Sequence, residues 1–452
     1  MRIFFSVTFV VLLLMSAAIW EMRPPAVVNG KTVLSWVSDD NPMRQGQIKL
    51  FNEMNPTDLL QLDPSNGGTE KVIVQSLAGV GPDFFDCYNG FQLSAYVKSG
   101  IAWDVTDELE KMGIDVHKQV WKALYPDLEL DGRIYGYGTN ASADAMWFNK
   151  TLFEKAGVPF PTGVKTWQEF VPLAQKLTIR DEDGKAQQFG LLFDWSGSWL
   201  QFVDQWGGRL YSEDGTRCTL DSPESVGALS FMHDLIYKYK VTPSPVEEAA
   251  MATQGGWGSG TITLFGAGKG AMALGGRWWL CTLRDPKNYK DLRLGAFLCP
   301  IGKYYVYRGY GKGTLINKNS PRRKEALKFL AYLASPAYNR LINHQADGVG
   351  PLISSVSTPD FLHDPDYPNE DYNMVWRSAM LHAVPEQISP FVNGQAADRI
   401  ISKQMDLIKD DQKSVEAGLK TIQEQIDEEI HKTIARDPSL RARYRKITGR
   451  SV

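Results

Sequence analysis

The residues of this sequence best suited to binding chemistry are aromatic side chains that stand next to polar ones. Among the 13 tryptophans of the chain, Trp278 follows Gly275, Gly276 and Arg277 at the end of an expected strand. An aromatic ring packs against apolar C–H faces, while charged and amide groups hydrogen-bond hydroxyls. Trp278 and Arg277 therefore predict a contact with a small molecule that carries both kinds of surface. Simple packing in the core is the alternative for Trp278.

A second set of candidates follows the ends of expected strands. Open α/β sheets bind ligands at the carboxyl ends of their strands. Asp39 and Asp40 come directly after the expected strand 32–37. Similar loop positions are held by three further polar residues, namely Tyr88, Asn89 and Asn140. All five are predicted ligand contacts, with a solvated turn as the alternative.

Three more tryptophans have mixed interpretations. Trp195, Trp199, Phe202 and Trp206 recur at helical spacing, which is typical of a face that packs in the core. Trp195 and Trp199 stay candidates for ligand contact because a Ser-Gly-Ser loop sequence lies between them. Trp257 stands among five glycines and serines, where a bulky ring is poorly placed for a core, so it is also predicted to reach the ligand.

Motifs for other chemistries do not emerge. The six histidines are scattered without a paired spacing, so no metal site is predicted. The segment 266–270 is glycine-rich but has Gly270 where a phosphate loop needs Ser or Thr. No cofactor and no catalytic residues are predicted, although a carboxylate pair for glycoside cleavage would be invisible to spacing.

Length and charge narrow the class of protein. A chain of 452 residues suggests two or three domains. The net charge is −3, with acidic and basic residues interspersed, which gives no reason to expect nucleic acid as a partner. Only the stretch from Arg436 to Arg450 is strongly basic, and it predicts either a solvated helix end or a contact with a membrane surface.

The N-terminus predicts export. Arg2 precedes an apolar run from Ile3 to Met15, and small residues follow at 16–18, as in a secretory signal. Continued through Trp20, the run approaches the length of a membrane span. Residues 1–29 are therefore either a cleaved signal or a retained anchor, and membrane contact is expected only there. The rest of the chain is predicted to be periplasmic or extracellular.

Cysteine usage is compatible with export. The four cysteines, Cys87, Cys218, Cys281 and Cys299, contain no C-x-x-C motif. Cys281 and Cys299 are the nearest pair in sequence, and both a disulfide and buried free thiols remain open.

Strand and helix patterns alternate along the chain. Residues 145–148 form a short apolar strand pattern before a helix, and Thr166 with Glu169 forms a capping box at the start of the next helix. Alternation of this kind predicts an α/β fold with helices on both faces of a sheet.

Several segments, taken in order, resemble the extracellular solute-binding proteins of ABC-type sugar importers, the family that includes maltose-binding protein. They are Gly81-Pro82-Asp83-Phe84-Phe85, Gly132-Arg133-Ile134-Tyr135-Gly136, Met146-Trp147-Phe148-Asn149-Lys150, Thr166-Trp167-Gln168-Glu169-Phe170, and Gly268-Lys269-Gly270-Ala271-Met272 with Gly276-Arg277-Trp278. The sequence departs from the family at Phe148, where the family usually has a tyrosine. No motif marks the aromatic contact that the family often places late in its second lobe.

The resemblance implies a fold and a function. The fold would be two α/β lobes with a ligand cleft between them, lobe 1 comprising 30–141 and 309–349 and lobe 2 comprising 142–308 and 350–452. The hinge segments would lie near 140–143, 308–313 and 348–351. The function would be capture of a saccharide, without catalysis, and delivery to the transmembrane subunits of an ABC importer. Alternatives are the same fold with a polyamine, phosphodiester or iron ligand, or an exported carbohydrate-active enzyme.

Overall fold

The structure is a computed structural model that describes residues 8–11, 26–64, 68–162, 165–251 and 260–450. Within these ranges, no helix has both the length and the apolar character needed to cross a membrane. Most of the predicted signal or anchor, and Trp257, lie outside the described residues.

The first of two large sheets has seven strands and holds the beginning of the chain together with a later return. Its central order is β1-β2-β4-β13-β14, with β3 paired to β2 and β7 paired to β13. Their bounds are Val27–Val28 (β1), Lys31–Val37 (β2), Asp58–Asp63 (β3), Phe84–Cys87 (β4), Gly136–Ala143 (β7), Tyr307–Ile316 (β13) and Ala383–Val384 (β14). Strands β2, β3 and β4 are parallel, so their carboxyl ends meet at one edge of the sheet.

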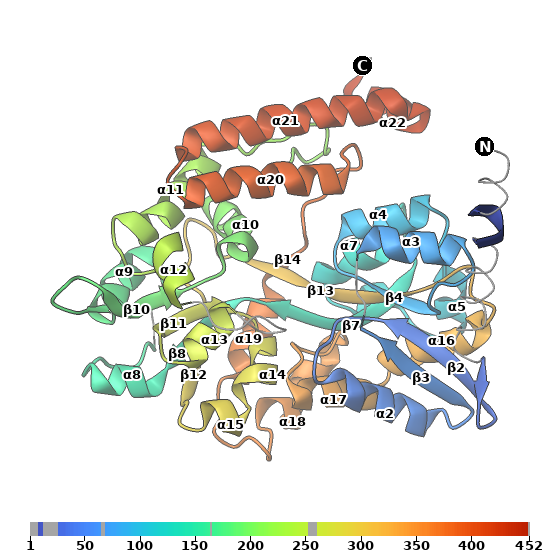
Figure 1. Ribbon diagram of the computed structural model, residues 1–452, viewed down its shortest axis with the longest axis horizontal. Helices are drawn as coiled ribbons and strands as arrows, with labels where there is room; N and C mark the ends of the chain where they lie inside the picture. The colour runs from blue at the N-terminus through green and yellow to red at the C-terminus, as the bar shows by residue number, and fades with distance from the viewer. Residues whose placement is uncertain (1–7, 12–25, 65–67, 163–164, 252–259, 451–452) are drawn as a thin grey trace.

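Helices cover this sheet on both faces (Figure 1). On one side lie α3 (Thr69–Leu77), α4 (Gly90–Lys98) and α7 (Tyr125–Leu128), and on the other α2 (Arg44–Met54), α16 (Arg323–Leu333) and α17 (Pro336–Gln345). Coverage on both faces explains why all four residues of β4 are buried. The α/β fold predicted from the sequence is confirmed.

The second sheet has five strands in the order β12-β8-β11-β10-β9. These are Leu294–Phe297 (β12), Ala145–Asn149 (β8), Gly270–Gly275 (β11), Ala186–Leu192 (β10) and Ile179–Arg180 (β9). The helices packed around it include α9 (Trp167–Lys176), α10 (Trp195–Trp206), α11 (Pro223–Tyr237), α13 (Thr261–Gly266) and α19 (Asn373–Leu381). The predicted capping box is present at α9, where Thr166 accepts from the Glu169 amide and Glu169 accepts from the Thr166 amide.

Three segments run between the sheets and pair with one another. Strand β7 leads into β8, and β13 returns from β12 to lie antiparallel to β7 from Gly309 to Leu315. The later segment at Val349 forms a bridge to Ala141 of β7. The resemblance implied hinges in these three segments. Strands β7 and β13 lie side by side at the centre of the molecule (Figure 1).

The C-terminal helices pack across both halves. Helices α20 (Gly394–Lys409) and α21 (Val415–Arg436) lie side by side above the two sheets (Figure 1). Helix α20 contacts both α4 and α10, and α21 contacts α11. The basic residues of the final stretch lie on α22 (Pro438–Thr448), where Arg443 forms an ion pair with Asp131 at 3.2 Å.

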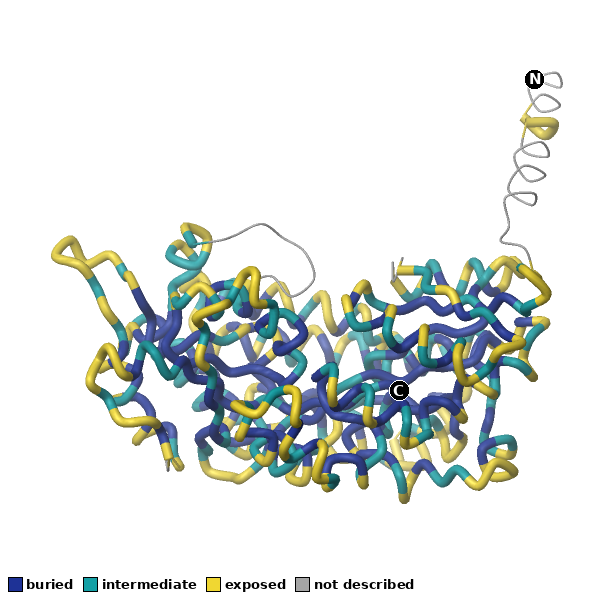
Figure 2. The backbone as a smooth tube through the Cα atoms, turned by 90° about the horizontal axis from the view of Figure 1, so that it is seen from below, coloured by how far each residue is buried: buried dark blue, intermediate teal, exposed yellow. Residues whose placement is uncertain are grey.

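Buried strands run through the interior of both halves, while the exposed residues lie on the outer helices and loops (Figure 2). One large cluster of buried side chains extends from Leu34 and Trp36 in the first sheet to Trp147 and Met272 in the second. All four cysteines are buried and free, so the disulfide alternative for Cys281 and Cys299 is not realised.

The pairing of β7 with β13 requires glycine at position 311. A Cβ atom at Gly311 would lie 2.4 Å from the Asn140 carbonyl oxygen, which is backbone and cannot move aside. We therefore expect Gly311→Ala to lower the free energy of unfolding by about 1–3 kcal/mol in urea denaturation. Gly227→Ala in the interior of α11 is the matched control, since its Cβ would meet Trp206 at an ordinary 3.4 Å. Helix propensity should make that control more stable by up to about 1 kcal/mol, and equal stability of the two variants would contradict the packing argument.

Candidate functional site

Lys312 brings together the polar residues at the ends of β2 and β4. Its side chain enters from β13 and is 2% exposed. The Lys312 Nζ donates to the Ser38 hydroxyl and to Asp39 Oδ1, each at 2.9 Å, and lies 2.8 Å from Asp86 Oδ2. Asp86 also accepts from Trp36 Nε1 and from the hydroxyls of Ser38 and Thr314. One buried ammonium thus fixes the carboxyl ends of two neighbouring strands.

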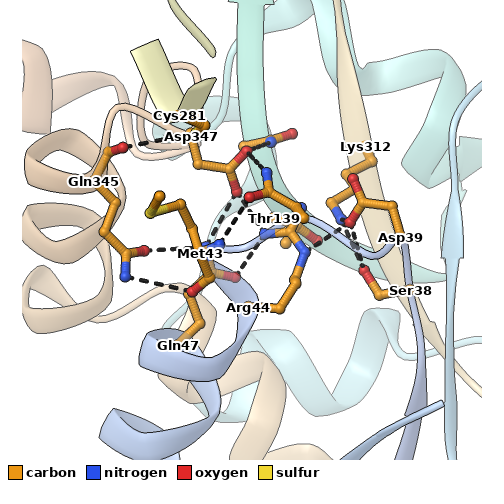
Figure 3. Close-up of polar contacts among 12 residues, drawn as sticks. Ser38, Asp39, Met43, Arg44, Gln47, Thr139, Cys281, Lys312, Gln345 and Asp347 are labelled. Atoms are coloured by element: carbon orange, nitrogen blue, oxygen red, sulfur yellow. Dashed lines mark hydrogen bonds and ion pairs between the residues drawn. The ribbon is translucent and has the colours of Figure 1, made fainter. Parts of the chain in front are cut away.

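Arg44 extends this network from the first turn of α2 (Figure 3). Its Nε donates to Asp39 Oδ1 at 2.7 Å, and its Nη1 donates to Asp347 and to Gln47. Asp347 also accepts from Asn41 and, at 3.0 Å, from Asn140. The Arg44 Nη2 is buried without a hydrogen-bond partner among the described residues. The network therefore links β2, α2 and β7 with the segment after α17.

The charged side chains of this network carry no net positive charge. Burial raises the pKa of Asp39, but the charges of Lys312 and Arg44 outweigh burial and hold that pKa well below its usual range. Asp39, Asp86 and Asp347 contribute three carboxylates against the two cations Lys312 and Arg44. A site with this balance does not favour an anionic ligand.

A second polar group lies along the same strand. Tyr310 stands two residues before Lys312 on β13 and therefore projects from the same face. The Trp278 Nε1 donates to the Tyr310 hydroxyl at 3.0 Å, and that hydroxyl donates to Asp144 Oδ1 at 2.6 Å. Burial raises the pKa of Asp144 to about 6, and the Tyr310 hydrogen bond opposes this shift. The half-buried Trp278 ring thus stands beside a hydroxyl and a carboxylate.

Five predicted contacts can now be placed in the structure. Asp39 is half-buried in the Lys312 network, and Asp40 beside it is exposed. Asn140 lies within β7 and not in the predicted loop, and it joins the network through Asp347. The half-buried Tyr88 ring lies 5.7 Å from Lys312 Nζ. Asn89 caps α4, where its side chain accepts from the Gln92 amide. Four of the five therefore lie near Lys312, and Asn89 has a local structural role.

Three other predicted contacts are buried. Trp195 and Trp199 are 2% and 8% exposed within α10, as the core interpretation of their stripe predicts. Arg277 is 1% exposed and donates to Asn373 Oδ1 and the Gly348 carbonyl. Burial lowers its pKa to about 10. The Arg277 guanidinium thus holds the chain behind Trp278 instead of facing open space.

Several residues of the site were missed by the sequence reasoning. Lys312 and Tyr310 lie within the segment 308–313, which the resemblance marked only as a hinge, and Asp86 directly follows the expected strand at Phe85. Alternation along 308–313 would have grouped Tyr310 with Lys312 on one face. Arg44 and Asp347 have no such signal, because their pairing joins positions 303 residues apart.

One cluster of potential metal ligands occurs outside this region. His344, Asp364 and Asp366 place ligand atoms within 4.8 Å of one another among the described residues. The two ring nitrogens of His344 face different carboxylates, at 3.0 Å from Asp364 and 3.8 Å from Asp366. The His344 imidazole is hydrogen-bonded to Asp364 and only loosely paired with Asp366, and we assign no metal to these groups.

Comparison with known proteins agrees with the two-lobed α/β arrangement. Residues 38–340 match the family of bacterial extracellular solute-binding proteins. Because this match covers more than half of the sequence, the chain belongs to that family.

Curated relatives include arabinooligosaccharide-binding proteins. That of Halalkalibacterium halodurans is 28% identical over 209 residues, 45% of this chain and 44% of the relative. That of Bacillus subtilis is 27% identical over 115 residues, 25% of each chain. The chain thus matches less than half the length of these relatives.

Solved structures share the fold across nearly the whole chain. The Listeria monocytogenes ABC substrate-binding protein Lmo0181, in complex with cycloalternan, has a TM-score of 0.74 and 22% identity over 90% of this chain and 99% of its own. Maltose-bound MalE3 of T. maritima has a TM-score of 0.71 and 19% identity over 87% of this chain and 98% of its own. At these identities the likeness concerns the fold alone.

The Lys312 network should contribute strongly to stability. Lys312→Met leaves Asp86 buried without its cation, and we expect the free energy of unfolding to fall by about 3–5 kcal/mol. Adding Asp86→Asn should recover part of the loss, because the uncompensated charge is then removed. Lys49→Met is the matched control, since the Lys49 side chain is 78% exposed in a 3.8 Å pair with Glu53 and should cost less than about 1 kcal/mol. Urea denaturation measures all three, and a loss no larger than the control would contradict the assigned role.

Proposed function

We propose that this chain captures a saccharide between its two halves and delivers it, without chemical change, to the transmembrane subunits of an ABC importer. The observation that carries the proposal is the chain of contacts from Trp278 through Tyr310 to Asp144 beside the Lys312 network. An aromatic ring with hydroxyl and carboxylate neighbours suits a molecule that has apolar C–H faces and a hydroxyl rim. Relatives named for arabinooligosaccharide binding, and neighbours with bound cycloalternan or maltose, support the same ligand class.

The proposed lobes are residues 30–141 with 309–349, and residues 142–308 with 350–452. Hinges between the lobes are supported by the three segments that connect them. Strand β13 and the segment at Val349 both pair with β7 where the chain passes from one sheet to the other. Closure of the lobes on a ligand would need only small backbone rotations at these crossings. Trp278 would then belong to lobe 2, and Asp39, Asp40 and Tyr88 to lobe 1.

Export fits the extracellular family to which the chain belongs. We propose that residues 3–20 direct it, either as a cleaved signal or as a retained anchor. N-terminal sequencing of protein from membrane and secreted fractions separates these two forms. Full-length protein free in the cytoplasm would contradict both.

The ligand class is tested by a thermal-shift screen against mono- and oligosaccharides, because a ligand bound only by the folded state raises the melting temperature. A saccharide that shifts the melting temperature and is recovered unaltered after incubation supports binding. Recovery of shortened products would indicate the enzyme alternative instead.

Trp278 is expected to stack on a sugar ring. Loss of the ring in Trp278→Ala removes apolar contact worth about 1–3 kcal/mol, which corresponds to roughly tenfold to a hundredfold weaker binding by calorimetry. Trp103→Ala is the matched control, because Trp103 is also half-buried but lies against Arg323 in the first half. Unchanged affinity in folded Trp278→Ala would exclude the contact, and loss of folding would assign Trp278 to the core.

A further inference from the structure

A group of carboxylates surrounds Arg308, at the beginning of β13. The Arg308 Nη2 lies 3.3 Å from Glu386 Oε1, and Tyr310, two residues on, holds Asp144. Five carboxylates lie close enough to feel the charge of Arg308, namely Asp127, Asp144, Asp204, Glu386 and Asp398. We call these five residues the Arg308 carboxylate cluster.

The cluster forms where the two halves meet. Asp127 belongs to α7, which packs on the first sheet, and Asp204 belongs to α10, which lies beside the second sheet. Glu386 accepts from the Gly90 amide at the start of α4, and Gln387 donates to Asp204 at 2.6 Å. Asp144 joins the cluster to Trp278 through Tyr310. The cluster is therefore continuous with the proposed saccharide site.

Negative charge in the cluster exceeds the positive charge nearby. Besides Arg308, only Arg209 near Asp204 and Arg399 near Asp398 oppose the five carboxylates among the described residues. Burial raises the pKa of Asp127 well above its usual range and those of Asp144 and Asp204 to about 6. Burial likewise raises the pKa values of Glu386 and Asp398. Carboxylates left without enough cations destabilise the ligand-free protein.

Two buried groups in this region have no partner within the described part of the chain. Asp127 is 4% exposed, and its carboxylate takes part in no hydrogen bond or ion pair there. Tyr211 is 1% exposed, its hydroxyl is unpaired, and Asp398 and Glu386 are among the charges that act on it. Buried polar groups are nearly always hydrogen-bonded, so the unpaired Tyr211 hydroxyl points to a polar ligand group in this region. The Asp127 oxygens are not among the fully buried unpaired atoms.

We propose that the saccharide bound by this protein carries a protonated amine, which lies in the Arg308 carboxylate cluster. An ammonium group supplies three N–H donors and one positive charge, and it forms the stronger, charge-assisted kind of hydrogen bond with carboxylates. A hydroxyl at the same place would leave the excess negative charge uncompensated, and a phosphate would add to it. This inference rests on the proposed saccharide function and names the class of saccharide.

Matched ligands separate the inference from the function on which it rests. Maltotriose and arabinotriose are each compared by calorimetry, at neutral pH, with a derivative in which one primary hydroxyl is replaced by an amine. An alkyl amine is protonated at neutral pH, as a lysine is. We expect an amine derivative to bind at least tenfold more tightly than its parent. Equal or weaker binding of the derivatives overturns the inference alone. If no saccharide binds, or if spermidine binds and the saccharides do not, the proposed function is overturned as well.

Asp127→Asn tests the cluster directly. The change keeps the shape of the side chain and removes its charge, so we expect the amine derivative to lose at least tenfold more affinity than the parent sugar. Because the pKa of Asp127 is raised in the native state, its ionisation at neutral pH destabilises that state. The variant should therefore have a higher melting temperature without ligand, a result that a merely structural carboxylate would not give.

Glu182→Gln removes the same charge from an exposed turn between β9 and β10 and should change neither affinity nor melting temperature. An equal loss of affinity for both ligands in Asp127→Asn would show that Asp127 binds hydroxyls and would overturn the inference. A lower melting temperature in that variant would do the same.

Discussion

Strand β13 pairs with β7 across the centre of the molecule, and the placement of both halves depends on this pairing. The two strands are antiparallel over seven paired positions from Gly309 to Leu315, and glycine at 311 allows their backbones to approach closely. Both strands belong to the first sheet. Strand β7 is followed directly by β8 of the second sheet, and β13 follows β12 of that sheet, so their backbone pairing holds the two connections together whatever their side chains are. The side chains of one face of β13 are consequently free for binding chemistry.

That face carries Arg308, Tyr310 and Lys312 at every second position. Lys312 is surrounded by carboxylates at the ends of β2 and β4, Tyr310 connects Trp278 with Asp144, and Arg308 lies among five carboxylates. The three side chains form a row from the first sheet towards the second. Rotation of one half against the other would move the partners of this row, so the proposed lobe closure would be coupled to the proposed ligand contact.

The electrostatics of the row set limits on the ligand. Around Lys312 the carboxylates are well paired, and Asp39 stays ionised because its cations outweigh the effect of burial. Around Arg308 the carboxylates are under-compensated, and burial raises their pKa values. The first group stabilises the folded chain at neutral pH, whereas the second destabilises it. Strongly perturbed pKa values of both kinds cluster at functional sites.

The local sequence pattern determined much of the secondary structure of this protein. The alternation of strands and helices, the buried strand at 145–148 and the capping box at Thr166 all follow from side-chain periodicity and hydrogen bonding within a few residues. The same reasoning placed Asp39 and Tyr88 after strand ends, near where the polar network forms. It placed Asn140 in a loop, whereas Asn140 lies within β7. It favoured the core for the α10 tryptophan stripe as a whole, because helical spacing reports which side of a helix is buried, but it kept Trp195 and Trp199 as ligand contacts, and both are buried.

Only the tertiary structure decided which charges meet. Arg44 and Asp347 are neighbours through a fold that closes a loop of 303 residues, and the Arg308 carboxylate cluster draws its members from five separate parts of the chain. The burial of Arg277, predicted as a ligand contact, likewise depends on Asn373, which lies 96 residues away. Periodicity describes the environment of a residue within its own element. Ion pairing and desolvation depend on distances between elements, and those are set only when the whole chain has packed.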